Sequence, residues 1–203
     1  MDDTVVITLF RHGLTEENKR KAYLGWKDSP LCPESMRIAI SNRYELYFSS
    51  DLQRCITTAK LLFPEDEVTI LPELREMNFG IWDGKTYDDL IDEEVYQKWL
   101  SDPFFTSPPG GETFQHFTKR VDIGWELISQ QMLGGNHKSC SVVTHGGVIR
   151  YLLSKFAPIQ RDFWSWQTPH NQGYELIFAR KALRRGERCI SLQEVPLTVK
   201  ENG

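Results

Sequence analysis

The stretch that decides the fold runs from Val5 to Gly13 and reads VVITLFRHG. An unbroken run of apolar and β-branched residues, here Val5 to Phe10, is typical of a strand buried on both faces of a parallel sheet. An arginine, a histidine and a glycine follow directly, at the carboxyl end of that strand. Because open α/β sheets bind their ligands at this edge, residues 11–13 are the first candidates for a functional site.

The same pattern returns at residues 140–147, where CSVVTHGG places another histidine and glycine after an apolar run. Strands and helices are expected to alternate along the chain, which favours a three-layer α/β sandwich with a mostly parallel central sheet flanked by helices. One domain over residues 1–203 is expected, and the strand order of its last third stays open. Further strands are expected at 45–50, 68–71, 174–181 and 188–195, with a basic tip between the last two, and helices at 51–63, 114–132 and 148–156.

Residues 77–111 interrupt this alternation and are expected to form a cap over one end of the sheet. The segment is expected to contain a loop at 77–84, a helix from about Thr86 to Leu100, and an irregular loop rich in proline and glycine at 102–111. Between Met77 and His116 there are two cations and eight acids, a net charge of −6. The aromatic side chains of this region form either a stacking surface for a ligand or the cap's own core: Trp82, Tyr87, Trp99, Phe104, Phe105 and Phe114.

Composition narrows the classes of partner. The net charge of −4 gives no global basic field for nucleic acid or an anionic membrane, so no such partner is expected. No apolar run approaches the roughly 20 residues of a membrane helix, and the first 15 residues do not read as a secretory signal, which favours a cytoplasmic protein. The cysteines are far apart and are expected to be reduced and packed, without zinc or disulfides: Cys32, Cys55, Cys140 and Cys189. The sequence does not indicate an oligomeric state.

Arg54 is the next candidate. If Asp51 or Ser50 caps the helix that follows, Arg54 lies in its first turn, where the helix dipole disfavours a cation by roughly 0.3–1 kcal/mol. A bound anion is one explanation for a cation in this position, and a solvated surface arginine is the other.

His12 and His145 each follow an apolar run and precede a glycine. One such histidine is often only a packed residue, but two at the same edge of a sheet favour a common site. Gly13 and Gly146 let backbone amides approach a ligand closely. With Arg11, these groups predict a pocket of phosphate size, in which one imidazole attacks phosphorus. The attacking imidazole has to be neutral, so a carbonyl or a similar acceptor is expected to accept a hydrogen bond from its other nitrogen.

Five segments, in order, resemble the histidine phosphatase superfamily, which includes the phosphoglycerate mutase-like proteins: RHGLTEEN, SSDLQRCITTA, LREMNFGIWDG, GGET and VVTHGG. The resemblance covers about residues 5–155. It implies that His12 is the nucleophile that becomes phosphohistidine and that Glu76 is the proton donor to the leaving group. Arg11, Arg54 and His145 then hold the phosphoryl group. Substrate-binding positions are expected at Gly13, Thr15, Asn18, Leu24, Gly25 and Gly146.

The resemblance implies a metal-independent phosphomonoesterase that acts on a small phosphorylated metabolite and needs no cofactor. Leu74-Arg75-Glu76 and the following Phe79-Gly80 are similar to the phosphatase branch, and the acidic cap offers few partners for the second phosphate of a mutase. A phosphoglycerate mutase and a non-catalytic phosphate-binding regulatory module remain the alternatives. Leu14 and Leu24 depart from the family pattern, and segment 31–49 is about ten residues short on typical loop and helix lengths, which predicts a truncated first helix.

Overall fold

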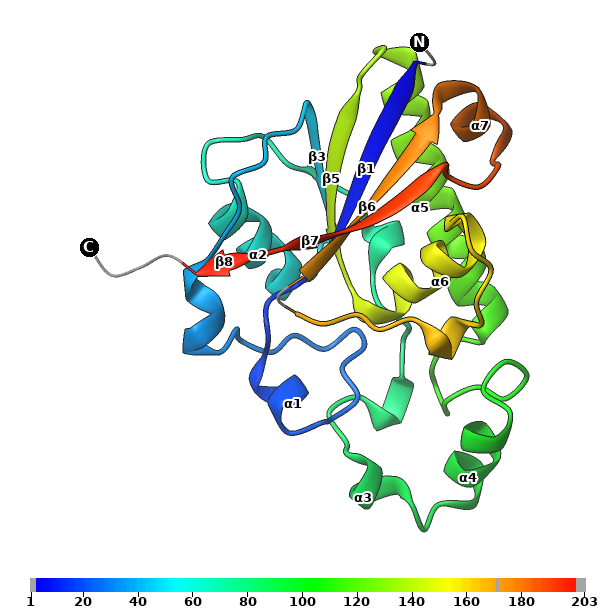
Figure 1. Cartoon of the computed structure of the whole chain (residues 1–203). Coiled ribbons are helices and arrows are strands. Elements are labelled where there is room, and N and C mark those ends of the chain that lie inside the picture. The colour runs from blue at the N-terminus through cyan, green and yellow to red at the C-terminus, as the bar shows by residue number, and fades with distance from the viewer. Residues whose placement is uncertain (1–2, 171, 200–203) are drawn as a thin grey trace.

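The computed structural model describes residues 3–170 and 172–199, and its centre is a mixed six-stranded sheet in the order β4-β3-β5-β1-β6-β7 (Figure 1). The first four strands of this order run parallel, whereas β6 pairs antiparallel with β1 and β7 pairs antiparallel with β6. The strands are β1 (Thr4–Arg11), β3 (Leu46–Ser49), β4 (Thr69–Ile70), β5 (Ser139–Thr144), β6 (Gln172–Ala179) and β7 (Ser191–Pro196). A separate small ladder pairs β2 (Ile38–Ala39) with β8 (Thr198–Val199).

Strand β1 has the central position that its apolar sequence predicts. Val5, Ile7 and Leu9 belong to the core on one face of the sheet, and Phe10 belongs to the core on the other. All four side chains are fully buried. This double burial explains why the strand is apolar at nearly every position rather than at alternate ones.

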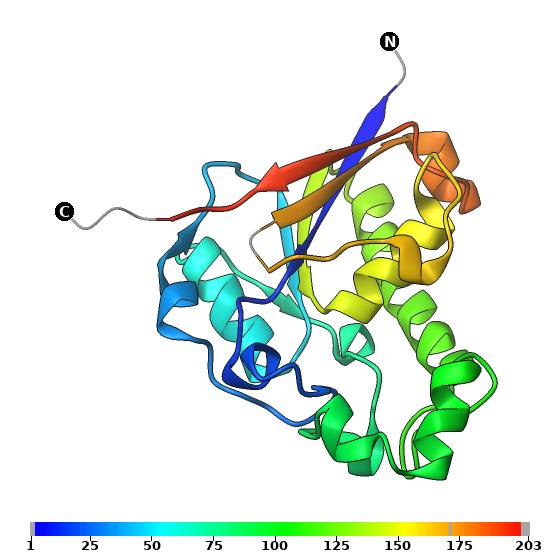
Figure 2. The same cartoon turned by 60° about the horizontal axis from the view of Figure 1, so that its bottom comes forward.

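Helices cover both faces of the sheet, which confirms the predicted α/β sandwich (Figure 2). On one face, α5 (Phe114–Gly134) and α6 (Gly146–Phe156) pack against the larger core, together with α7 (Arg180–Arg185). Helix α2 (Gln53–Leu62) covers the other face. The described part of the chain contains no helix with the length and apolarity needed to cross a bilayer.

Three local predictions were wrong. The helix expected from Thr86 to Leu100 is two helices, α3 (Tyr87–Leu90) and α4 (Glu94–Ser101), and the break between them lets both pack on one small core. The basic tip expected at 182–187 is largely helix α7, which ends at Gly186 with a φ of 66°. The helix cap expected at Asp51 or Ser50 is discussed below. The short segment 31–49 contains a five-residue 3-10 helix, Pro33–Arg37, after α1 (Glu16–Lys19).

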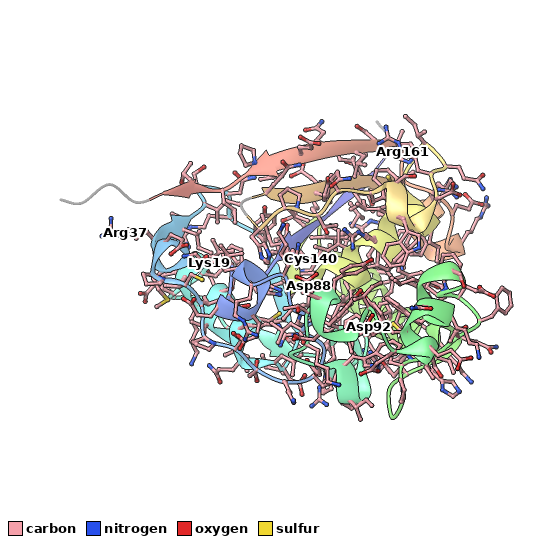
Figure 3. The ribbon with its side chains drawn as sticks, turned by 90° about the horizontal axis from the view of Figure 1, so that it is seen from below. Lys19, Arg37, Asp88, Asp92, Cys140 and Arg161 are labelled. Carbon is pink, nitrogen blue, oxygen red and sulfur yellow. The ribbon has the colours of Figure 1, made fainter. Side chains whose placement is uncertain are left out.

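The segment 77–111 lies beyond the carboxyl ends of β1 and β5, beside α1, as Figure 1 shows in green and blue. Figure 3 looks onto this end of the molecule, with Lys19 of α1 and Asp88 and Asp92 of the segment labelled. Its core consists of Trp82, Leu90, Tyr96 and Trp99, with Tyr23 and Phe79 packed against it. Among the aromatic residues that were expected either to stack on a ligand or to form the core of the cap, Trp82 therefore belongs to the core. Phe105 does not, because its side chain is 91% exposed.

The four cysteines are all buried, which confirms the prediction that their thiols are packed.

Candidate active site

Two imidazoles meet where β1 and β5 end. Residues 11 and 144 are paired in the parallel ladder, so His12 and His145 leave the sheet side by side. Their ring centroids are 5.2 Å apart, and both side chains are buried. The sheet therefore brings together two histidines that are 133 positions apart in the sequence.

The hydrogen-bond partners of each histidine ring indicate which ring nitrogen carries the proton and which carries the lone pair. Nδ1 of His12 donates to the carbonyl of Gly13 at 2.8 Å, as the sequence predicted, and this leaves the lone pair on Nε2. On the other ring, Nε2 of His145 lies 3.0 Å from the hydroxyl of Ser50. Burial, and then the charge of Arg54, hold the pKa of both histidines well below the usual 6.5, so both are neutral at pH 7. His12 is thus a neutral imidazole with a free lone pair.

Two guanidiniums lie next to these rings, that of the buried Arg54 and that of the half-buried Arg11. Arg11 donates from Nη1 to the carbonyl of Thr168 at 2.7 Å, and Arg54 donates to the carbonyls of Gly25 and Lys27 at 2.6 and 2.7 Å. The Nε of each arginine is buried and has no hydrogen-bond partner among the described residues. Burial lowers the pKa of Arg11 to about 10, against the opposing effect of Glu76, so it stays cationic at neutral pH. Buried cationic donors without acceptors are suited to an anion.

The first turn of α2 confirms the position predicted for Arg54 but not the predicted cap. Leu52 occupies the N-cap position without a side-chain bond, and the carboxylate of Asp28 accepts from the amides of Gln53 and Arg54. Asp51 instead forms a bidentate pair with Arg75. The cap was missed because Asp28 is 25 positions before the helix and only the fold brings it there.

The carboxyl group of Glu76 lies at the amino end of α6, close enough to Arg11 to oppose the lowering of its pKa. Its Oε2 accepts from the amide of Gly147 at 2.8 Å, and its Oε1 accepts from the amide of Met77 at 2.9 Å. Because Arg75 pairs with Asp51, the carboxylate of Glu76 is not committed to its neighbour. The arrangement places one carboxyl group at the mouth of the anion site.

A cleft of about 470 Å³ extends from Arg11 and Glu76 of this site to the segment 77–111. Its lining among the described residues does not include His12, Arg54 or His145. Five of the residues predicted from the sequence line it: Arg11, Asn18, Leu24, Glu76 and Gly146. Its outer wall adds Tyr23, Phe79, Trp99, Arg150 and Trp164, among others.

Three of the predicted substrate-binding residues make other contacts. The amide of Gly13 donates to Thr58, and the hydroxyl of Thr15 caps α1 by accepting from the amide of Asn18. The amide of Gly25 donates to the buried carboxylate of Asp83 at 2.9 Å. These residues hold the loops behind the cleft.

Sequence reasoning missed three residues at the site. The carbonyl of Thr168 accepts from Arg11, and Nδ1 of His170 lies 2.8 Å from the carbonyl of His12. Arg150 lines the cleft with its guanidinium carbon 5.7 Å from the ring centroid of Trp164. Of these three residues, only Arg150 could have been found from the local sequence. It lies four residues after Gly146 on α6 and therefore on the same face of the helix.

These buried histidines predict a pH-dependent stability. The unfolded chain takes up protons as the pH falls below about 6.5, whereas the fold keeps His12 and His145 neutral. The free energy of unfolding should therefore fall below pH 6.5, by up to about 1.4 kcal/mol per pH unit for each histidine. Urea denaturation at pH 7 and pH 5 measures this slope. The unfolding free energy of His145→Asn should change less with pH than that of the wild type. His116→Ala, which removes an exposed histidine, is the control and should behave as the wild type. Equal pH dependence in all three proteins would contradict the conclusion that the buried histidines cause it.

The α/β sheet with two histidines, two arginines and a carboxyl group at its carboxyl edge defines a class of phosphate-handling proteins. The family model described as "Histidine phosphatase superfamily (branch 1)" matches residues 7–182. The chain belongs to this superfamily, and the comparisons support a phosphatase.

Among curated relatives, the adenosylcobalamin/alpha-ribazole phosphatase of Escherichia coli (strain K12) is 31% identical over 158 residues, which is 72% of this chain and 76% of the relative. The 2,3-bisphosphoglycerate-dependent phosphoglycerate mutase of Cytophaga hutchinsonii is 26% identical over 96% of this chain and 97% of its own length. The solved alpha-ribazole phosphatase from Shigella flexneri has the same fold, with a TM-score of 0.78 and 24% identity over 98% of this chain and 100% of that one.

Proposed function

We propose that this chain is a metal-independent phosphomonoesterase that forms a phosphohistidine at His12. The observation that carries the proposal is the convergence of two buried imidazoles with the guanidiniums of Arg11 and Arg54, whose buried Nε atoms have no partner among the described residues. Phosphoryl transfer proceeds through a loose, charge-dispersed transition state, so positioning and electrostatic stabilisation do most of the catalysis. These four groups supply both.

In the first step, Nε2 of His12 attacks phosphorus and the bond from phosphorus to the ester oxygen breaks. Glu76 gives its proton to the departing oxygen, because its carboxyl group lies at the mouth of the site beside Gly147. Arg11, Arg54 and His145 stabilise the phosphoryl oxygens. The alcohol leaves, and the phosphoryl group stays on His12.

In the second step, water attacks the phosphohistidine. The carboxylate of Glu76 takes a proton from this water, and the bond between phosphorus and Nε2 breaks. Inorganic phosphate leaves, and both Glu76 and the neutral His12 are restored. The hydrogen bond from Nδ1 of His12 to Gly13 is made throughout both steps, so one tautomer serves both.

The cleft supports a small metabolite as the substrate. A volume of about 470 Å³ is within the roughly 300–1,000 Å³ of small-ligand sites. Its outer wall offers the aromatic rings of Tyr23, Trp99 and Trp164 to the leaving group, and Arg150 adds one cation. Alpha-ribazole 5′-phosphate is the first candidate, because curated relatives are named alpha-ribazole phosphatases and a similar solved structure is described as an alpha-ribazole-5′-P phosphatase.

A mutase is the second candidate, since the Cytophaga hutchinsonii relative covers nearly the whole chain. A mutase has to hold a second phosphate, whereas the described lining of the cleft has only Arg11 and Arg150 as cations. The net charge of −6 between Met77 and His116 also disfavours a second anion. Isomerisation of 3-phosphoglycerate tests this alternative. A non-catalytic phosphate-binding module has no need of a proton donor at Glu76, and trapping of phosphohistidine distinguishes it.

Hydrolysis of p-nitrophenyl phosphate in EDTA tests the proposal. The charge that stabilises the transition state comes from Arg11, Arg54 and the two histidines, so we expect the same rate with and without the chelator. Wild-type chain that has been dialysed against EDTA and then assayed with added Mg²⁺ or Zn²⁺ is the control for a tightly bound ion. Activity that disappears in EDTA and returns with a metal ion contradicts the proposal.

A further inference from the structure

His170 is a third histidine at the phosphoryl site, and the proposed steps do not use it. It lies between the 3-10 helix Phe163–Ser165 and β6, and its ring centroid is 5.2 Å from that of His12. The centroid of His145 is also 5.2 Å from that of His12. The ring of His12 is therefore contacted by two other imidazoles.

The hydrogen bond of His170 fixes its tautomer. Its Nδ1 lies 2.8 Å from the carbonyl oxygen of His12. A carbonyl only accepts, so Nδ1 is the donor and the neutral ring has its lone pair on Nε2. Burial and the charge of Arg11 lower the pKa of His170 to about 4, so the ring is neutral at pH 7.

This bond restrains the residue that has just left the sheet. Strand β1 ends at Arg11, and the amide of His12 still donates to Thr144 on β5 at 2.9 Å. The carbonyl of His12 is next to the other neighbouring strand, β6, and the imidazole of His170 supplies its donor. The main chain of His12 is thus held by β5 on one side and by His170, which precedes β6, on the other, and Gly13 holds its side chain.

We propose that His170 is a positioning residue for the nucleophile, which holds the main chain and ring of His12 so that Nε2 faces the phosphoryl group. The inference rests on the proposed function, in which His12 is phosphorylated. A displacement of about 1 Å in a reacting group can lower a rate by roughly 100-fold. Loss of the bond from His170 should therefore slow the phosphorylation of His12 by about 10- to 100-fold, while the binding of phosphate changes little.

Two variants separate the hydrogen bond from the packing of the ring. His170→Phe keeps a ring and removes the donor, whereas His170→Asn keeps an N–H donor on a shorter side chain. The burst of p-nitrophenolate from p-nitrophenyl phosphate in stopped flow measures phosphorylation of His12. We expect a burst about 10- to 100-fold slower in His170→Phe and within about 5-fold of wild type in His170→Asn, with KM for p-nitrophenyl phosphate within about 3-fold in both.

A burst in His170→Phe that is as fast as wild type overturns the inference, and so does a burst in His170→Asn that is as slow as that of His170→Phe. If wild-type chain forms no phosphohistidine, the proposed function fails and this inference with it; if wild type forms it and His170→Phe does so equally fast, only this inference fails. A second measurement does not depend on the variants. ¹⁵N spectra of histidine-labelled wild type at pH 7 should show His170 as the neutral Nδ1–H tautomer, and an Nε2–H tautomer overturns the inference.

Discussion

Replacement of His12 with alanine should lower kcat for p-nitrophenyl phosphate by at least about 10³-fold, because no other group can form the covalent intermediate at that position. His145 is not expected to substitute, since its Nε2 lies 3.0 Å from the hydroxyl of Ser50. Steady-state assays at saturating substrate measure this loss. Phosphohistidine, which is labile in acid and stable in base, should be trapped in the wild type and absent from the variant.

The controls separate chemistry from folding. His12→Asn is closer in shape to the buried imidazole, and it should be as inactive as His12→Ala while it keeps a polar group in the pocket. His116→Ala removes an exposed histidine at the start of α5 and should leave kcat unchanged. If both His12 variants fold and either one turns over within 10-fold of wild type, another residue is the nucleophile.

The sequence was sufficient for the residues that local patterns place at one edge of the sheet. His12 and His145 follow apolar runs that are buried on both faces, and parallel strands end at the same edge. Arg54 was placed correctly in the first turn of a helix that follows a third such strand. For each of these residues, a few consecutive amino acids indicate the strand or helix and also show where it begins or ends.

The residues that sequence reasoning missed depend on pairings between distant strands. His170 reaches the site because β6 runs antiparallel to β1, which puts the start of β6 at the end of β1, with Gly173 opposite Phe10. The amino-acid pattern did not determine this strand order. Likewise, Asp28 caps α2 from a loop, and the helix expected at 86–100 divides because Trp82, Leu90, Tyr96 and Trp99 share one core. Such effects are tertiary and override local propensity.

Glu76→Gln should have an effect that depends on the leaving group. Glutamine keeps a carbonyl oxygen for the amide of Gly147 but cannot donate or accept the proton of the reaction. Phenyl phosphate and p-nitrophenyl phosphate differ only in the nitro group, yet phenolate is a far more basic leaving group and needs the proton in the first step. We expect kcat for phenyl phosphate to fall by about 10²- to 10⁴-fold, the usual contribution of a general acid or base.

With p-nitrophenyl phosphate, the p-nitrophenolate ion leaves without a proton, so the first step of Glu76→Gln should be within about 10-fold of wild type. The second step still needs Glu76 to accept a proton from water, so a burst of p-nitrophenolate should precede slow turnover and phosphohistidine should accumulate. Glu34→Gln, which changes an exposed carboxylate paired with Lys19, is the matched control and should behave as wild type. Equal losses for the two substrates in the burst phase would show that Glu76 acts on binding or folding and is not the proton donor. Fast turnover of both substrates would assign the proton transfers to another group.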